Sequence, residues 1–85
     1  MKLNIYSLYD YKTESYVTPS FLHRDAQATR SVSDAVNDPT TTLYKHPDDY
    51  ALFRIGEFDD STGELTPTQP PVLIVQLASL KQTIS

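Results

Sequence analysis

The sequence has no cysteine and only two glycines among its 85 residues. The missing cysteines exclude disulfide bonds, zinc–thiolate clusters and cysteine nucleophiles. With Gly56 and Gly63 as its glycines, the chain lacks a glycine-rich loop of the kind that cradles a phosphate. Its longest apolar stretch, residues 72–77, is interrupted by Gln76, whereas crossing a bilayer takes about 20 apolar residues. We therefore expect a small protein that does not enter a membrane.

The composition, 39% hydrophobic and 21% charged, is typical of one folded domain. A chain of this size buries roughly 60% of the surface that its unfolded form exposes, so its core is small and self-association is an option. The net charge of −4 argues against nucleic-acid binding as a default. Acids outnumber bases six to two in residues 47–85 but are balanced by bases in residues 1–46, so the first half would meet any polyanion.

The pattern of side chains along residues 2–23 predicts the first two strands. Residues 2–9 place Leu3, Ile5 and Ser7 on one face and Tyr6 and Leu8 on the other, which predicts a strand. Residues 16–23 predict a second strand that forms a hairpin with the first. Since Pro19 lacks an N–H, this second strand belongs at an edge or contains a bulge.

One helix is predicted over residues 26–37, with Asp25 as its N-cap and a stop before Pro39. Its apolar stripe contains only alanine and valine, so the helix has to lie close against a sheet. That stripe consists of Ala28, Val32, Ala35 and Val36.

The second half predicts further strands. Residues 40–44 are β-prone, and residues 50–58 are predicted to form the strongest strand. Alternation along residues 50–58 places two sets of side chains on opposite faces of the strand: Tyr50, Leu52 and Phe58 on one, and Ala51, Phe53 and Ile55 on the other. A tight reversal at 59–63 leads to a short strand at 64–66; residues 72–77 predict a buried strand and residues 78–84 a helical turn. The fold class expected is α+β, an antiparallel sheet of about five strands with one helix packed on one face. The alternative is a small five-stranded OB-like barrel.

The prolines at 67, 70 and 71 suggest a division of the chain. Residues 1–66 are predicted to form a single α+β domain, and residues 67–85 a proline-rich hinge with an apolar C-terminal strand. That strand either completes its own sheet or is exchanged with a second copy in a homodimer. Both arrangements fit, because a domain this small gains much from a doubled core.

The sequence contains no arrangement typical of a catalytic or metal site. The histidines, His23 and His46, lie far apart in the chain, and no nucleophile motif accompanies them. The acidic pairs at 48–49 and 59–60 are typical of turns, in which carboxylates bond local backbone amides. We therefore expect no enzyme activity, no metal and no cofactor.

Nucleic-acid binding has the clearest signal. Five of the six tyrosines lie in the half of the chain that also carries five of the seven bases. Single-strand binders use aromatic faces for bases and cations for phosphates. Tyrosine is also an ordinary strand residue, and its enrichment in strands favours a structural role for these rings. The candidate nucleic-acid-binding residues are Tyr9, Tyr11, Lys12, Tyr16, Arg24, Arg30, Tyr44 and Lys45.

Several segments carry a family resemblance. The opening KLNIYSLYD and the stretch VNDPTTTLYKHPDDYALFRIGEFDDSTGEL are similar to the small non-structural protein of gokushoviruses, single-stranded DNA phages of the Microviridae. The resemblance covers roughly residues 2–66. The VNDP turn, the HP-D-DY turn and the IG-x-FDD-x-TG hairpin carry it together.

The resemblance implies a non-catalytic DNA-binding protein that acts in single-stranded DNA genome replication or packaging, in the cytoplasm of the infected bacterium. Single-stranded DNA is then the expected partner. The alternative is an acidic protein–protein adaptor for the phage replication initiator or for capsid assembly, without direct DNA contact. A homodimer is compatible with either function, and a second copy would double a DNA-binding track.

Overall fold

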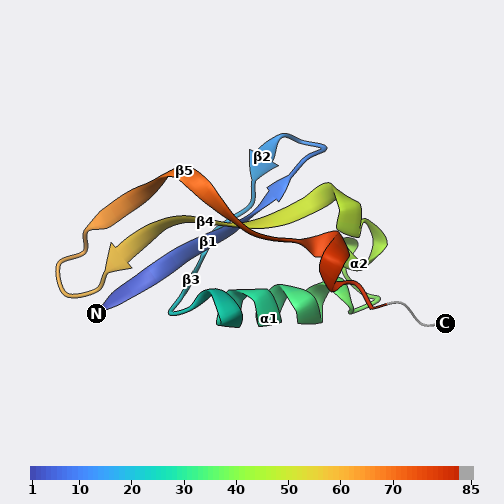
Figure 1. Ribbon diagram of the computed structural model, residues 1–85, viewed down its shortest axis with the longest axis horizontal. Coiled ribbons are helices and arrows are strands. Elements are labelled where there is room, and N and C mark those ends of the chain that lie inside the picture. The colour runs from blue at the N-terminus through green and yellow to red at the C-terminus, as the bar shows by residue number, and fades with distance from the viewer. Residues whose placement is uncertain (83–85) are drawn as a thin grey trace.

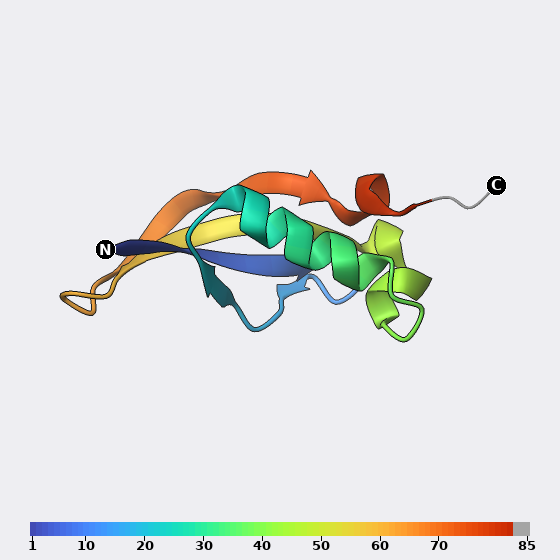
Figure 2. The same cartoon turned by 90° about the horizontal axis from the view of Figure 1, so that it is seen from below.

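The fold consists of one twisted antiparallel sheet with a helix across one face (Figures 1 and 2). The computed structural model describes residues 1–82. In chain order the elements are β1 Lys2–Asp10, β2 Ser15–Tyr16, β3 Ser20–Leu22, α1 Asp25–Val36, α2 Thr42–Lys45, the 3-10 turn η1 Pro47–Asp49, β4 Tyr50–Asp59, β5 Leu65–Gln76 and the 3-10 turn η2 Leu77–Leu80.

The strand order is β2-β1-β4-β5, and β3 pairs with β1 along the same edge as β2. All pairings are antiparallel. Tyr9 lies opposite Tyr16 in the β1–β2 ladder, Tyr6 opposite Arg54 in the β1–β4 ladder, and Phe58 opposite Leu65 in the β4–β5 ladder. This open sheet of five strands with one main helix confirms the α+β prediction. The barrel alternative is wrong, because β5 and the β2/β3 edge lie at opposite sides of the sheet and do not close.

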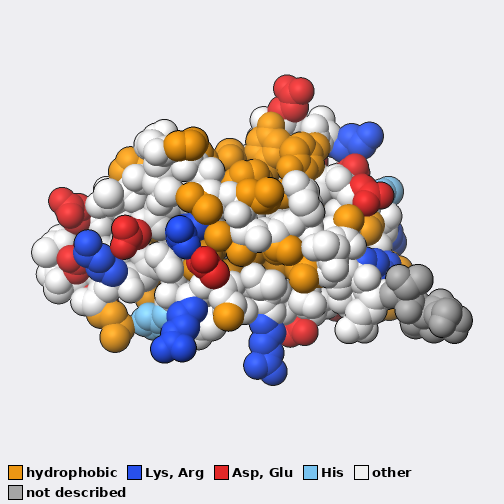
Figure 3. Space-filling model, viewed as in Figure 1, with side chains coloured by type: hydrophobic (Ala, Val, Ile, Leu, Met, Phe, Trp, Pro, Cys, Tyr) orange, Lys and Arg blue, Asp and Glu red, His pale blue; other side chains and the backbone are white. Residues whose placement is uncertain are grey.

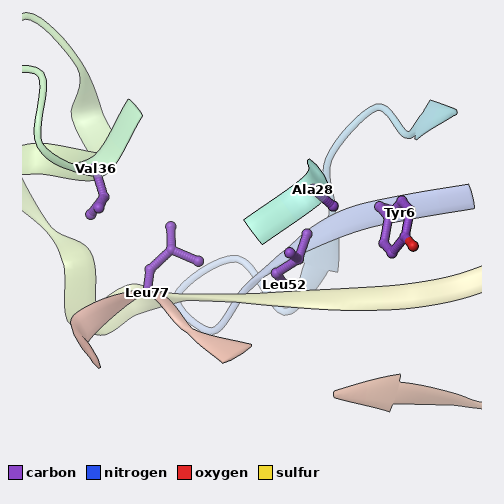
Figure 4. Packing of buried hydrophobic residues seen from close by; sticks show 5 residues of the cluster. All are labelled: Tyr6, Ala28, Val36, Leu52 and Leu77. Atoms are coloured by element: carbon purple, nitrogen blue, oxygen red, sulfur yellow. The ribbon is translucent and has the colours of Figure 1, made fainter. Parts of the chain in front are cut away.

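The core lies between α1 and the sheet. Figure 4 shows five residues of the buried apolar cluster there, contributed by two strands, the helix and η2: Tyr6, Ala28, Val36, Leu52 and Leu77. Small side chains on the helix let its backbone approach the sheet closely, as the alanine–valine stripe predicts. Leu77 is fully buried, so the chain after β5 contributes to the core of its own molecule.

A polar contact fixes the start of α1 on the sheet. The Tyr6 hydroxyl donates to Asp25 Oδ1 over 2.5 Å, and Arg54 Nη1 lies 2.9 Å from Asp25 Oδ2. Asp25 was expected as the N-cap, but it is the first helical residue, and its carboxylate is engaged by the sheet. The Gln27 side chain performs the capping instead, since its Oε1 accepts from two backbone N–H groups at 23 and 24, each at 3.1 Å.

This contact shifts two pKa values. Burial, and then the hydrogen bond to Asp25, raise the pKa of Tyr6 to about 12. The same hydrogen bond, followed by the Arg54 guanidinium, lowers the pKa of the Asp25 carboxyl. Both shifts favour the protonation states that exist at neutral pH, so the contact is stabilising there.

Two predicted strands are wrong in part. The strand expected over 16–23 is divided into β2 and β3, and residues 17–19 between them, including Pro19, lie outside the sheet. The β-prone segment 40–44 contains instead the start of α2, because the Thr41 hydroxyl caps that turn and accepts from the Tyr44 N–H over 3.1 Å.

The prolines at 67, 70 and 71 lie inside β5, where a hinge was expected. Edge strands tolerate proline because its missing N–H is not needed for a second ladder. Within residues 1–82, β5 thus pairs with its own β4. Val72 and Leu73 are 38% and 48% exposed, so the expectation of a buried strand there is wrong for these two residues. The helical turn expected over 78–84 is present as η2, while residues 83–85 lie outside the described residues.

A bulge in β4 changes which side chains share a face. Tyr6 pairs with Arg54 but Ile5 pairs with Gly56, so Ile55 is the extra residue. The side chains beyond it change sides. Phe58 was expected on the face of Tyr50 and Leu52, but it packs on Phe21, with ring centroids 5.6 Å apart.

Candidate nucleic-acid interface

The sheet has one face away from α1. Tyr6 and Leu8 of β1 pack into the core beneath the helix, so the residues between and beyond them, including Tyr9, point to the other face. Figures 1 and 2 together show α1 along one side of the sheet and no described helix across the other. We call this second side the open face.

Four aromatic rings form a cluster on the open face, which we call the tyrosine cluster: Tyr9, Tyr11, Tyr16 and Phe53. The Tyr9 ring is central, with centroid distances of 5.1 Å to Tyr11, 4.9 Å to Tyr16 and 6.2 Å to Phe53. Tyr16 and Phe53 are 5.8 Å apart. All four contacts are edge-to-face, the arrangement that aromatic rings prefer. The rings therefore hold one another in fixed orientations.

The outer rings of the tyrosine cluster remain accessible. Tyr11 is 45% exposed and Tyr16 is 44% exposed, while Tyr9 is only partly exposed. Gln76 Nε2 donates to the Tyr11 hydroxyl over 3.2 Å, which links the cluster to β5. Figure 3 shows hydrophobic side chains gathered over β2 and the strands beside it. This surface is aromatic and accessible to a ligand.

Local structure explains why these tyrosines meet. Tyr9 and Tyr11 are two residues apart, so both project from the same side of the chain as it leaves β1. The turn that follows is held by Asp10, whose Oδ1 accepts from the Lys12 N–H over 2.9 Å, and Glu14 has a positive φ of 56°. The turn returns the chain so that Tyr16 pairs directly with Tyr9.

The candidate cations are distributed over several surfaces. Lys12 is exposed in the turn beside Tyr11 and takes part in no ion pair within residues 1–82. Arg24 and Arg30 are exposed at the start and along the length of α1, which covers the other face of the sheet. The structure therefore brings Lys12 to the tyrosine cluster and leaves both arginines away from it.

Tyr44 and Lys45 are also separate from the cluster. They belong to α2, beyond the C-terminal end of α1 (Figure 1). The Lys81 ammonium lies 3.4 Å from the centroid of the Tyr44 ring and donates to the Tyr44 carbonyl over 3.2 Å. A cation–π contact of this kind occupies one face of the ring. The eight predicted residues thus do not form one patch: Tyr9, Tyr11, Lys12 and Tyr16 come together, and the other four do not.

Sequence reasoning missed the phenylalanines of the open face. Phe53 completes the tyrosine cluster, and Phe21, 47% exposed, packs on Phe58 nearer the other end of β1. The signal for Phe53 was present, because it alternates with Leu52 in the strongest predicted strand. Phe58 could not be assigned, since the bulge at Ile55 reverses its side.

The remaining surface offers little for other chemistry. Among the described residues, no group of three potential metal ligands comes together. A cavity of about 150 Å³ lies between α1, β1 and residues 17–20, and it is lined by aliphatic side chains and hydroxyls such as those of Val32 and Ser31. No charged side chain is among its lining residues. Within residues 1–82 no helix has the length and apolar character needed to cross a bilayer.

Comparison with known proteins identifies the family. The family model described as Phage ORF5 protein matches residues 3–80, which is nearly the whole chain. Neither the curated proteins nor the solved structures contain a significant match. The chain therefore belongs to the Phage ORF5 protein family.

Proposed function

We propose that this phage protein is a non-catalytic single-stranded DNA-binding protein, and that the open face is its binding surface. The observation that carries the proposal is the tyrosine cluster, in which Tyr11 and Tyr16 keep nearly half of their surface exposed on a sheet face that no described helix covers. An exposed aromatic ring on an uncovered sheet is a natural platform for a nucleobase.

In this proposal, unpaired bases stack on the rings of Tyr11 and Tyr16, and each stacked base contributes about 1–3 kcal/mol. Tyr9 and Phe53 hold these two rings in place by edge-to-face contacts. Lys12, at the rim of the cluster, neutralises a backbone phosphate. Duplex DNA is excluded from this mode, because its bases are already stacked and their faces cannot reach the rings.

The charge distribution sets the expected salt dependence. The protein carries a net charge of −4, and of its candidate cations only Lys12 lies at the tyrosine cluster. The slope of log affinity against log salt is about −0.7 for each phosphate contact on a single strand. With one or two such contacts the slope should lie near −1. Participation of Arg24 and Arg30 would make the slope steeper.

Fluorescence anisotropy with labelled single-stranded and duplex oligonucleotides tests the proposal. Tyr11→Leu and Tyr16→Leu should each weaken single-strand binding by about 5- to 150-fold, the equivalent of one lost stack. Tyr44→Leu is the matched control, because Tyr44 lies in α2 under Lys81 and should change affinity little. Unchanged affinity in both open-face variants, or equal binding of duplex, would contradict the proposal.

A protein–protein adaptor is the second candidate. It is favoured by the acidic β4–β5 turn, where Asp60 and Glu64 are exposed at the far end of the molecule from α2 (Figure 1). Such a turn suits a basic surface of a phage replication initiator or capsid protein. If single-stranded DNA does not bind at low salt, while charge reversal at Asp60 and Glu64 abolishes association with such a partner, the adaptor function replaces DNA binding.

The phage type, the cellular location and the stage of infection are proposed from the family resemblance. The resemblance to gokushovirus proteins suggests a Microviridae phage and a role in single-stranded genome replication or packaging. Such a protein would act in the cytoplasm of the infected bacterium and need no cofactor. The two stages can be distinguished in infected cells, because loss of replication reduces the amount of single-stranded genome, whereas loss of packaging leaves genomes that remain sensitive to nuclease.

A further inference from the structure

A second aromatic pair lies on the open face, nearer the other end of β1. Phe21 is 47% exposed, and its ring packs edge-to-face on Phe58, with the centroids 5.6 Å apart. Phe21 is opposite Ile5 in the β1–β3 ladder, and residues directly opposite each other share a face. Ile5 alternates with Tyr6, which packs beneath α1, so Phe21 projects from the open face. We call Phe21 and Phe58 the phenylalanine pair.

The phenylalanine pair and the tyrosine cluster are aligned along one edge of β1. Tyr16 is opposite Tyr9 and Phe21 is opposite Ile5, and β2 and β3 lie on the same side of β1. Residues 5 and 9 are four positions apart, which corresponds to about 13 Å along a strand. A stacked nucleic-acid strand advances about 3.4 Å per nucleotide, so about five nucleotides span both positions. One short oligonucleotide can therefore reach both groups of rings.

The described strands direct no charged side chain onto the open face. In the β1–β4 ladder, Arg54 is opposite Tyr6, on the side that α1 covers, and the other charged strand residues share that side by register. These five residues are Lys2, Asp10, Arg54, Glu57 and Asp59. The rings therefore lie on a surface with no strand cation for a phosphate and no strand carboxylate to repel one. Such a surface favours a strand that turns its bases to the protein.

We propose that the open face binds about five nucleotides of a single strand across both aromatic groups, with bases on the rings and phosphates towards solvent. This inference rests on the proposed function and adds the length and the orientation of its ligand. One base stacks on the tyrosine cluster and another on Phe21, which Phe58 holds in place. Each stack increases the affinity about 5- to 150-fold. A strand too short to reach both groups gains one stack only.

Oligothymidines of increasing length, from a dinucleotide to a decanucleotide, test the span in calorimetric titrations of the full chain. Affinity should rise up to about five nucleotides and then change little. Phe21→Leu removes the ring but keeps an apolar side chain, and should weaken binding of an octanucleotide about 5- to 150-fold. Dinucleotide binding should change by no more than about twofold, because the tyrosine cluster remains available to it. Phe21→Tyr is the matched control: it retains a ring and should bind like the wild type.

The salt dependence of the wild type gives a second measurement that needs no variant. Because the strands place no cation on the open face, the slope of log affinity against log salt should stay near −1 at every length. Phosphates bound along the face would instead steepen the slope by about 0.7 for each added contact. A slope that steepens in this way would overturn the orientation with the bases turned inwards.

The outcomes separate this inference from the proposed function. Unchanged octanucleotide affinity in Phe21→Leu, while Tyr11→Leu and Tyr16→Leu still weaken binding, would overturn the two-group site and leave the proposed function intact. An equal loss in Phe21→Tyr and Phe21→Leu would also overturn it, because a ring is retained in the former. If no single-stranded oligonucleotide binds, the proposed function fails and this inference fails with it.

Discussion

The hydroxyl of Tyr6 provides a direct test of how α1 is attached to the sheet. Tyr6 is 2% exposed, and its hydroxyl donates to the Asp25 carboxylate over 2.5 Å. Tyr6→Phe removes this bond without removing the ring. A hydrogen bond to a charged group contributes about 1.5–3 kcal/mol, so the free energy of unfolding should fall by that amount. In a domain of this size the melting temperature should decrease by about 6–24 °C.

The pH dependence makes this test specific to the hydroxyl. Because the pKa of Tyr6 is raised from 10.0 to about 12, the folded state favours the neutral phenol. Its contribution is complete below pH 10 and is lost as the pH rises through 12. A shift of this size corresponds to about 3 kcal/mol. The stability difference between wild type and Tyr6→Phe should therefore shrink over this range.

Urea unfolding at pH 8, 10 and 11.5, followed by far-UV circular dichroism, measures both quantities. Tyr16→Phe is the control, because Tyr16 is 44% exposed and donates no side-chain hydrogen bond among the described residues. It should change the free energy of unfolding by less than about 0.5 kcal/mol at every pH. A stability loss in Tyr6→Phe that is equally small, or one that is the same at pH 8 and 11.5, would refute this account of the contact.

Three further predictions concern packing. Gly56→Ala should destabilise by about 1–3 kcal/mol, because a Cβ there would lie 2.8 Å from the Thr66 carbonyl oxygen; an unchanged urea midpoint would contradict this. Leu77→Ala should cost about 2–5 kcal/mol, since the side chain is fully buried, whereas Leu65→Ala, 62% exposed, should cost less than about 0.5 in the same assay. Asn37→Ala should accelerate amide exchange in η2, because the Asn37 amide donates to the Leu80 carbonyl over 3.0 Å; unchanged exchange would show that this bond is dispensable.

Local sequence patterns predicted the main helices and strands. They failed where tertiary contacts or helix capping determined the local structure. The alternation in residues 2–9 and the stripe of α1 follow from burial, so both were predictable. Residues 40–44 favour a strand by composition, but the Thr41 hydroxyl accepts from the Tyr44 N–H and so stabilises a helical turn there. The side of Phe58 depends on one extra residue at Ile55, and no alternation pattern reveals a bulge.

The candidate site was predictable where it depends on neighbours in sequence. Tyr9, Tyr11 and Tyr16 meet because a strand alternates and a short turn follows it, and both features are visible in the sequence. Arg24 and Arg30 were grouped with them on charge alone. Which face of the sheet the helix covers depends on the complete three-dimensional packing, so the separation of these arginines from the tyrosines required the structure.

The central position of β1 has a consequence for how the chain acquires its structure. β1 precedes the other described strands, yet its long ladder is with β4, whose register pairs Lys2 with Asp59, 57 residues later in the sequence. Contacts between residues distant in sequence slow folding, because a large loop must close before they form. The β1–β4 ladder therefore cannot form until β4 has been synthesised, and the aromatic side chains of β1 remain accessible to chaperones until then.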